Sequence, residues 1–137
     1  MRIATWNVNS IRTRVDRVTD WLSRADVDVL AMQETKCKDD QFPHEAFEEL
    51  GYQVAHHGLS QWNGVAIASR VGIEDVQIGF DGQPQWQDAD EARAIGATCG
   101  KNYIADPGLH RSLAGDGLAT TMSALFGGPA NTTYGEN

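Results

Sequence analysis

The sequence predicts an α/β fold, and three observations support this. Short runs of β-favouring residues alternate with helix-length amphipathic segments at the start of the chain, and several further strand patterns follow. Neither an internal repeat nor a low-complexity tract interrupts this order. The length of 137 residues suits one modest domain.

The first strand is expected over Arg2–Val8, where small, polar and β-favouring residues alternate before Asn9 and Ser10 break the pattern. Over Arg14–Ala25 the apolar residues fall on one face of a helix. The nearly continuous apolar run Val27–Gln33 has the length of a buried strand. These segments predict a strand, a helix and a second strand in succession.

A second helix is expected over Pro43–Leu50, because proline suits the first helical position and Gly51 ends the pattern. The preceding segment Lys36–Gln41 is predicted to be a polar loop. Further strands are predicted over Tyr52–His57, Val65–Ser69, Glu74–Ile78 and Arg93–Cys99.

The pattern changes after Gly100. Asp106 suits an N-cap, and apolar residues recurring every three to five positions predict one amphipathic helix over Pro107–Phe126. A polar tail, Asn131–Asn137, follows it. The chain has no run of 18 apolar residues, so we expect no segment to span a membrane.

The net charge of −8 argues against a general nucleic-acid binder, which usually carries a basic patch. It leaves open an enzyme that holds a metal ion with carboxylates and has a local cationic rim. Arg12, Arg14 and Arg17 fit such a rim, or a solvated helix start. Only Cys37 and Cys99 could form a disulfide, and with no secretory signal we expect free thiols in the cytoplasm.

Two polar residues are candidates for chemistry, because each lies at the carboxyl end of a predicted strand. Asn7 ends the first strand and Glu34 follows the second, where α/β folds build their sites. A carboxylate there can bind Mg²⁺, and a neighbouring carboxamide can orient it. By itself a glutamate after a strand is more often a cap or a solvated loop residue.

Residues 1–100 resemble the N-terminal part of the exonuclease III family, within the exonuclease–endonuclease–phosphatase superfamily. The matching segments are MRIATWNVNSIR, DVLAMQETK, FPHEAFEELGY and NGVAIASR, in the family's order and spacing. The resemblance implies a four-layered α/β sandwich and DNA phosphodiester hydrolysis with Mg²⁺ (or Mn²⁺), acting on duplex DNA with abasic sites or 3′ ends. It also implies that Glu34 is a metal ligand, Asn7 a catalytic residue and Arg93 a substrate-binding residue.

Several motifs of that family are absent from the sequence: a phosphate-contacting tyrosine, a Gly-Asp-x-Asn segment and a late Asp-His pair. Gly115 and Asp116 begin the second of these, but Leu118 stands where the asparagine belongs. We therefore expect little or no cleavage by these residues alone, weak metal binding, and self-association through a sheet that lacks its cover.

Residues 101–137 resemble an internal segment of the uracil permease family, from DPGLHR to NTTYGEN. The resemblance implies nucleobase contacts by Gly135 and Glu136; taken alone, the NTTYGEN motif, Asn131–Asn137, would be a polar loop. The sequence thus predicts a truncated fusion of a partial nuclease domain, 1–100, and a permease-like segment, 101–137. A non-catalytic fusion and a transporter fragment remain alternative interpretations.

Overall fold

A four-stranded mixed sheet forms the centre of the molecule in a computed structural model, which describes residues 1–83 and 91–100. Its strands are β1 (Ile3–Asn7), β2 (Val29–Gln33), β3 (Gln53–His57) and β4 (Val65–Ser69), in the spatial order β1-β2-β4-β3. β1 and β2 are parallel, whereas β4 runs antiparallel to both of its neighbours. The parallel pair needs a crossover, and helix α1 (Val15–Ala25) provides it.

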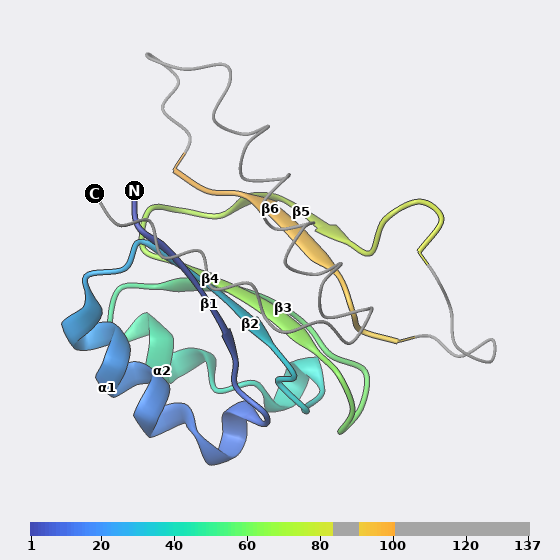
Figure 1. The fold of residues 1–137 in the computed structure, drawn as a ribbon, viewed down its shortest axis with the longest axis horizontal. Coiled ribbons are helices and arrows are strands. Elements are labelled where there is room, and N and C mark those ends of the chain that lie inside the picture. Colours follow the sequence, from blue (N-terminus) through green and yellow to red (C-terminus); the bar gives the residue numbers. More distant parts are fainter. Residues whose placement is uncertain (84–90, 101–137) are drawn as a thin grey trace.

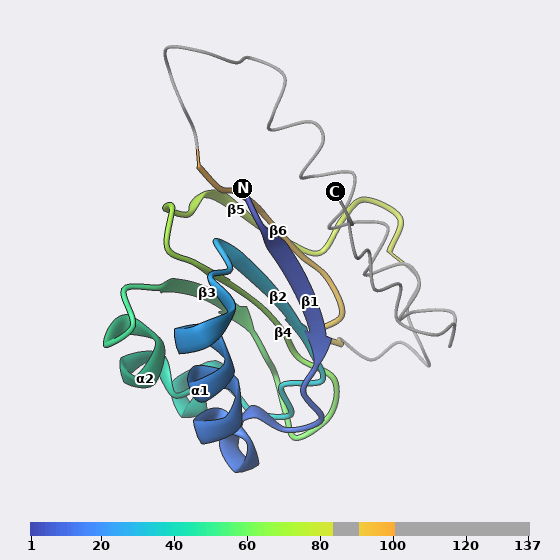
Figure 2. The same cartoon turned by 60° about the vertical axis from the view of Figure 1, so that its left-hand side comes forward.

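Both α-helices cover the same face of this sheet (Figures 1 and 2). The 3₁₀ turn η1 (Ile11–Thr13) precedes α1, and the 3₁₀ turn η2 (Asp39–Gln41) precedes the short helix α2 (His44–Glu48). Alternation along β2 directs Leu30 and Met32 toward the helices, where both are almost fully buried. The core also contains Val8, Ile11, Val18, Leu22, Val27, Cys37, Phe42, Phe47, Tyr52, Ala66 and Ala68.

A separate two-stranded sheet lies over the other face (Figures 1 and 2). Its antiparallel strands are β5 (Glu74–Ile78) and β6 (Ile95–Thr98), and β6 lies against β3 and β4. One mixed sheet with an uncovered face is expected from the sequence, and this expectation is wrong, because β5 and β6 form a second sheet over that face. Helices, central sheet and second sheet form successive layers, which confirms the sandwich class predicted for the N-terminal part.

The boundaries of the elements differ from the predicted ones by at most two residues. The second strand begins at Val29 and not at Val27, because Asp28 turns aside to accept the Arg2 backbone N–H at 2.6 Å. Pro43 precedes α2 and is not its first residue. The predicted polar loop contains the turn η2. The helix expected over Pro107–Phe126 lies outside the described residues.

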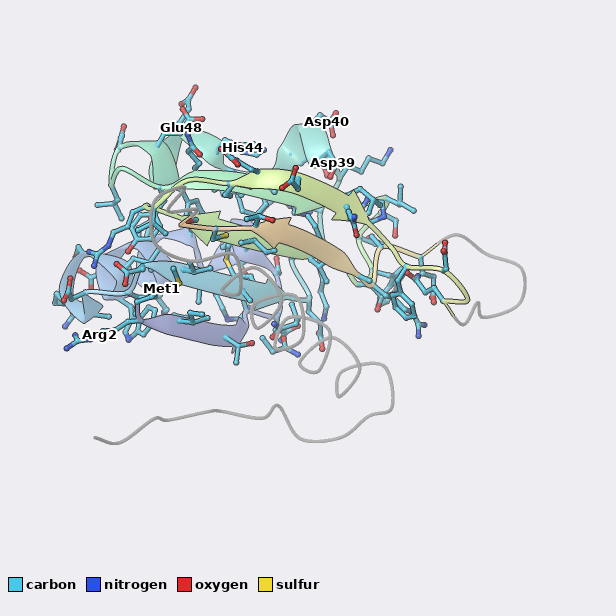
Figure 3. All side chains as sticks on the ribbon, turned by 90° about the horizontal axis from the view of Figure 1, so that it is seen from above. Met1, Arg2, Asp39, Asp40, His44 and Glu48 are labelled. Carbon is cyan, nitrogen blue, oxygen red and sulfur yellow. The ribbon has the colours of Figure 1, made fainter. Side chains whose placement is uncertain are left out.

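Charged residues join the strands at the edge opposite to the candidate site. Arg70, which follows β4, places Nη2 2.6 Å from Asp26 Oδ1 and 2.8 Å from Asp28 Oδ1. Hydrogen bonds from the Arg2 backbone and the Arg70 side chain hold the pKa of Asp28 below its ordinary range. Figure 3 labels Arg2 at this end and Asp39 at the far end of the sheet. These ion pairs fix one end of the strands whose other end carries the site.

Self-association is expected from the sequence through a sheet that lacks its cover, but the β5–β6 sheet lies over that face, so we predict association through the second sheet instead. Among the described residues, neither β5 nor β6 has a second strand neighbour, and Val76 and Ile78 of β5 are 47% and 54% exposed. An exposed apolar edge can pair with another chain, and a charge placed on it opposes this. We expect sedimentation velocity to show concentration-dependent association that Ile78→Lys reduces. Leu50→Lys on the helix-covered side is the control, and equal association by all three proteins would contradict the prediction.

Candidate functional site

The candidate site is at the edge of the central sheet that is formed by the carboxyl ends of β1 and β2 and the start of β4. The register pairs Asn7 with Gln33 and Gln33 with Val65, so three chain segments reach this edge together. The Asn7 side chain donates from Nδ2 to Glu34 Oε1 at 2.7 Å. The structure therefore brings Asn7 and Glu34 together, as the sequence predicts for residues at the carboxyl ends of parallel neighbours.

The Glu34 carboxylate is stabilised in its charged form. The hydrogen bond from Asn7 is the largest cause of a lowered pKa, partial burial opposes it, and Lys36 lowers it further. Lys36 Nζ lies 3.1 Å from Glu34 Oε2, and the Glu34 side chain remains 41% exposed. Glu34 is therefore an ionised, solvent-accessible carboxylate at neutral pH.

Lys36 and Asn9 also belong to the site, although the sequence does not single them out as site residues. Lys36 Nζ also donates to Asn9 Oδ1, and the Asn9 backbone N–H donates to Asn7 Oδ1 at 3.1 Å. A closed chain of contacts thus joins Asn7, Glu34, Lys36 and Asn9. The only sequence signal was a lysine two residues after a candidate glutamate, and it does not reveal which loop the lysine reaches.

The backbone that carries Glu34 is strained. Glu34 has φ 53° and Lys36 has φ 52°, in the left-handed region that costs a residue with a side chain about 1–2 kcal/mol. Backbone hydrogen bonds hold this segment, from Ser10 to the Glu34 carbonyl at 2.7 Å and from Lys36 to the Asn63 carbonyl at 2.9 Å. In this backbone conformation the Glu34 and Lys36 side chains lie together, with Nζ 3.1 Å from Oε2.

Arg93 lies on an adjacent segment of this edge and not in the Asn7–Glu34 pair. Its guanidinium forms an ion pair with Glu91, and Glu91 accepts a hydrogen bond from Asn63 Nδ2 at 3.3 Å. The neighbouring Gly64 N–H donates to the Ala92 carbonyl at 2.9 Å, which ties this segment to the start of β4. Among the described residues, no hydrogen bond or ion pair links Arg93 to Asn7 or Glu34. Gly135 and Glu136 lie outside the described residues.

The donor atoms at this edge suit a hard cation but are few. Glu34 supplies carboxylate oxygens, which Mg²⁺ and Mn²⁺ accept. Within residues 1–83 and 91–100 there is no group of three histidine, cysteine or acidic side chains that could hold a metal ion. The Lys36 ammonium, 3.1 Å from Glu34 Oε2, occupies a cation position beside the carboxylate. A divalent ion would compete with Lys36 or bind on the free side of Glu34.

Comparisons with known proteins agree with this fold. The sequence profile of the Endonuclease/Exonuclease/phosphatase family matches residues 4–130, so the chain belongs to that family. An AP endonuclease from Archaeoglobus fulgidus is 46% identical with a TM-score of 0.65, over 72% of this chain and 37% of that one. The 3′ phosphatase NExo from Neisseria, solved with a product DNA hairpin, is 30% identical with a TM-score of 0.68. This match covers 92% of this chain and 51% of that one.

Two curated relatives match different parts of the chain. Exodeoxyribonuclease III from Haemophilus influenzae is 34% identical over 80 residues, which is 58% of this chain and 30% of that protein. Uracil permease from Bacillus caldolyticus is 66% identical over 38 residues of a separate segment, 28% of this chain and 9% of that protein. The chain therefore joins a nuclease-like part to a permease-like segment, and it spans under a third of either relative.

A membrane-crossing helix is not found in the part of the chain that the structure describes, where every helix is too short and too polar.

The Asn7–Glu34 hydrogen bond predicts how Glu34 titrates. In Asn7→Ala, the pKa of Glu34 should rise toward its ordinary value of 4.5, because the carboxylate loses its strongest partner. The folded-state pKa is the lower one, so this bond stabilises the fold above the unfolded-state pKa and ceases to do so as pH falls through the folded value. With Glu34 partly exposed, we expect at most about 1 kcal/mol. Carboxyl ¹³C NMR titration measures the shift, and an unchanged Glu34 titration would contradict it.

Proposed function

We propose that the chain carries the metal-binding end of a DNA phosphodiesterase site that uses Mg²⁺ or Mn²⁺. One observation carries this: in the fold of a nuclease family, the ionised Glu34 is hydrogen-bonded to Asn7 at the carboxyl ends of two parallel strands. Polar groups that converge at strand ends are where α/β enzymes place their chemistry. The kinship with DNA-processing relatives supplies the substrate class.

Each residue then has a distinct role. Glu34 would hold the metal ion through oxygen, and the ion would supply Lewis-acid polarisation of a phosphoryl oxygen. Asn7 keeps the carboxylate ionised and aimed through its 2.7 Å hydrogen bond. Lys36 holds the second carboxylate oxygen until a cation or a phosphate displaces it.

The surface around this edge is suited to a nucleic-acid strand. Arg12 is exposed on η1, and Arg14 donates to the Asn9 carbonyl beside the site, so positive charge adjoins Glu34 despite the acidic chain. Trp62, in the loop between β3 and β4, is 66% exposed. An exposed indole offers a face on which a base or sugar can stack. Duplex DNA with an abasic site or a recessed 3′ end is the proposed partner.

Catalytic competence of residues 1–137 alone is a separate question. The described residues offer one metal carboxylate, and hydrolysis also needs an oriented water and stabilisation of developing charge. Removing one such group commonly costs about 10²–10³-fold. We propose that residues 1–100 act as a partial nuclease domain whose cleavage alone is near background, and that residues 101–137 are a separate segment.

The alternative is a fusion without defined activity, and the permease-like segment favours it. In a complete permease the residues matching Gly135 and Glu136 would face a nucleobase. We propose that they have no such role here, since this segment spans 9% of the permease that it matches.

A hybrid protein tests the proposed function. Residues 1–100 would replace the matching portion of the Archaeoglobus fulgidus AP endonuclease, 46% identical to this chain. We expect the hybrid to nick abasic duplex DNA with Mg²⁺ or Mn²⁺, and Glu34→Gln to lower nicking by at least about 10²-fold. The 137-residue chain should cleave near background.

Glu48→Gln, on α2 and away from this edge, is the matched control. A folded hybrid that nicks equally well with Glu34→Gln would reject Glu34 as the metal ligand. Robust nicking by the 137-residue chain that Glu34→Gln abolishes would reject the claim that it is nearly inactive alone.

Trp62 gives a prediction for binding. Trp62→Ala should weaken binding of abasic duplex DNA to the hybrid by about 1–3 kcal/mol, because an indole face is lost. Leu50→Ala, a partly exposed apolar side chain after α2, should leave the affinity unchanged. Fluorescence anisotropy at fixed salt compares the two variants, and equal affinities would place the DNA away from the loop between β3 and β4.

A further inference from the structure

A histidine lies within the apolar layer between the central sheet and the helices. His56 is on β3, and alternation places it on the helix-facing side together with Val54. Its side chain is 1% exposed, and its ring lies 4.6 Å from that of Phe42. A polar ring at such a position must satisfy its two nitrogens within the protein.

Both ring nitrogens have close partners. Nε2 lies 2.8 Å from Thr35 Oγ1, and Nδ1 lies 2.8 Å from Asp39 Oδ1. Burial lowers the pKa of His56 below its ordinary value of 6.5, so the ring is neutral at neutral pH. Nδ1 faces the Asp39 carboxylate without forming a hydrogen bond to it. With the proton on Nδ1, Nε2 accepts from the Thr35 hydroxyl.

Thr35 is the residue between Glu34 and Lys36, and it is completely buried. Its backbone N–H donates to the Gly64 carbonyl at 3.2 Å, and its carbonyl accepts from the Ile11 N–H at 3.0 Å. The hydroxyl contact with His56 is its third anchor. Thr35 is therefore held by three contacts, and the residues on either side of it, Glu34 and Lys36, have left-handed backbone conformations.

Close packing leaves this network little freedom. A Cβ on Gly64 would lie 2.2 Å from Thr35 Oγ1, and a Cβ on Gly58 would lie 2.5 Å from His56 Cε1. The Gly58 N–H also donates to Asp39 Oδ1 at 2.8 Å, which fixes the carboxylate beside the ring. Only glycine fits at both positions, so the hydroxyl and the ring are held in one arrangement.

We propose that His56 is a positioning residue for the candidate site: through the Thr35 hydroxyl it holds Glu34 in the backbone conformation that aims its carboxylate at Asn7. His56 itself touches neither Asn7 nor Glu34. This inference rests on the proposed function for its meaning, but the Asn7–Glu34 geometry that it predicts can be measured without metal or DNA.

A purely structural role for His56 would have a different signature. Loss of a satisfied core hydrogen bond would lower the free energy of unfolding while leaving Glu34 in place in the folded molecules. Loss of a positioning contact disturbs Glu34 in molecules that remain folded. Outer groups that orient a metal ligand typically affect metal affinity by about 10–100-fold.

The experiment uses ¹⁵N-labelled 137-residue protein and NMR. Thr35→Val keeps the shape of the side chain and removes the hydroxyl, His56→Leu removes both ring nitrogens, and His56→Gln retains an acceptor for Thr35. Tyr52→Phe is the control, because its buried hydroxyl donates to the Val27 carbonyl at the opposite edge. The readouts are the Asn7 side-chain amide signals, hydrogen exchange at the Lys36 amide, and Mn²⁺ affinity from paramagnetic broadening.

We expect Thr35→Val and His56→Leu to lose the hydrogen-bonded Asn7 signal, to speed exchange at Lys36 and to weaken Mn²⁺ binding by roughly 10-fold. His56→Gln and Tyr52→Phe should retain all three properties. Unchanged Asn7 and Lys36 signals in folded Thr35→Val would overturn the inference, even if His56→Leu fails to fold. A fourth outcome separates the two proposals. If the wild-type protein binds no Mn²⁺ and Thr35→Val still loses the Asn7 signal, the result would support positioning by His56 and count against the proposed metal site.

Discussion

The parallel pairing of β1 and β2 is the constraint on which the candidate site depends. In this register Asn7 is opposite Gln33, so the next residue of the second strand, Glu34, comes within hydrogen-bonding distance of the Asn7 side chain. A slip of one residue would turn Asn7 to the helix-covered face and bury its amide among apolar side chains. The apolar pattern that fixes the core, with Leu30 and Met32 directed toward the helices, therefore also fixes the site.

Strain at this edge is balanced by contacts from two other segments. The left-handed Glu34 and Lys36 would relax in an isolated loop, since each conformation is unfavourable for a residue with a Cβ. The segment is held because its backbone is bonded to Ser10 on one side and to Asn63 on the other. Each hydrogen bond contributes about 1 kcal/mol, so several of them are enough to offset the strain. A carboxylate aimed in this way loses little entropy when it binds a cation.

Local sequence information predicted those parts of the fold that local chemistry determines. Val65–Ser69 and Glu74–Ile78 were predicted with the observed bounds, because turn residues flank a β-favouring run on both sides. Asn7 and Glu34 could be paired because the carboxyl ends of neighbouring parallel strands meet. The two side chains lie side by side, as predicted, whereas their metal-binding and catalytic roles are proposals.

The missed features depend on contacts between distant segments. Alternation in β5 indicates a strand but not which sheet it joins, so the separate β5–β6 sheet was not foreseen. His56 is 21 residues from Thr35 in sequence, and nothing in the Val-Ala-His-His run shows that one histidine is buried and bonded. Lys36 was overlooked because its role depends on reaching both Glu34 and Asn9 across a turn.

The charge around Glu34 bears on how an acidic chain could hold DNA at this edge, as proposed. The net charge of −8 would repel a phosphate backbone at long range, but screening confines that repulsion to about 8–10 Å at physiological salt. At Glu34 itself, Lys36 forms an ion pair with the carboxylate. Arg14 donates to the carbonyl of Asn9, whose side chain Lys36 also contacts. In the proposed function, a divalent cation held by Glu34 would free the Lys36 ammonium from this carboxylate, and Lys36 could then pair with a phosphate. Metal binding at Glu34 and phosphate binding at Lys36 would therefore favour one another, because each breaks the Glu34–Lys36 ion pair that the other must also break.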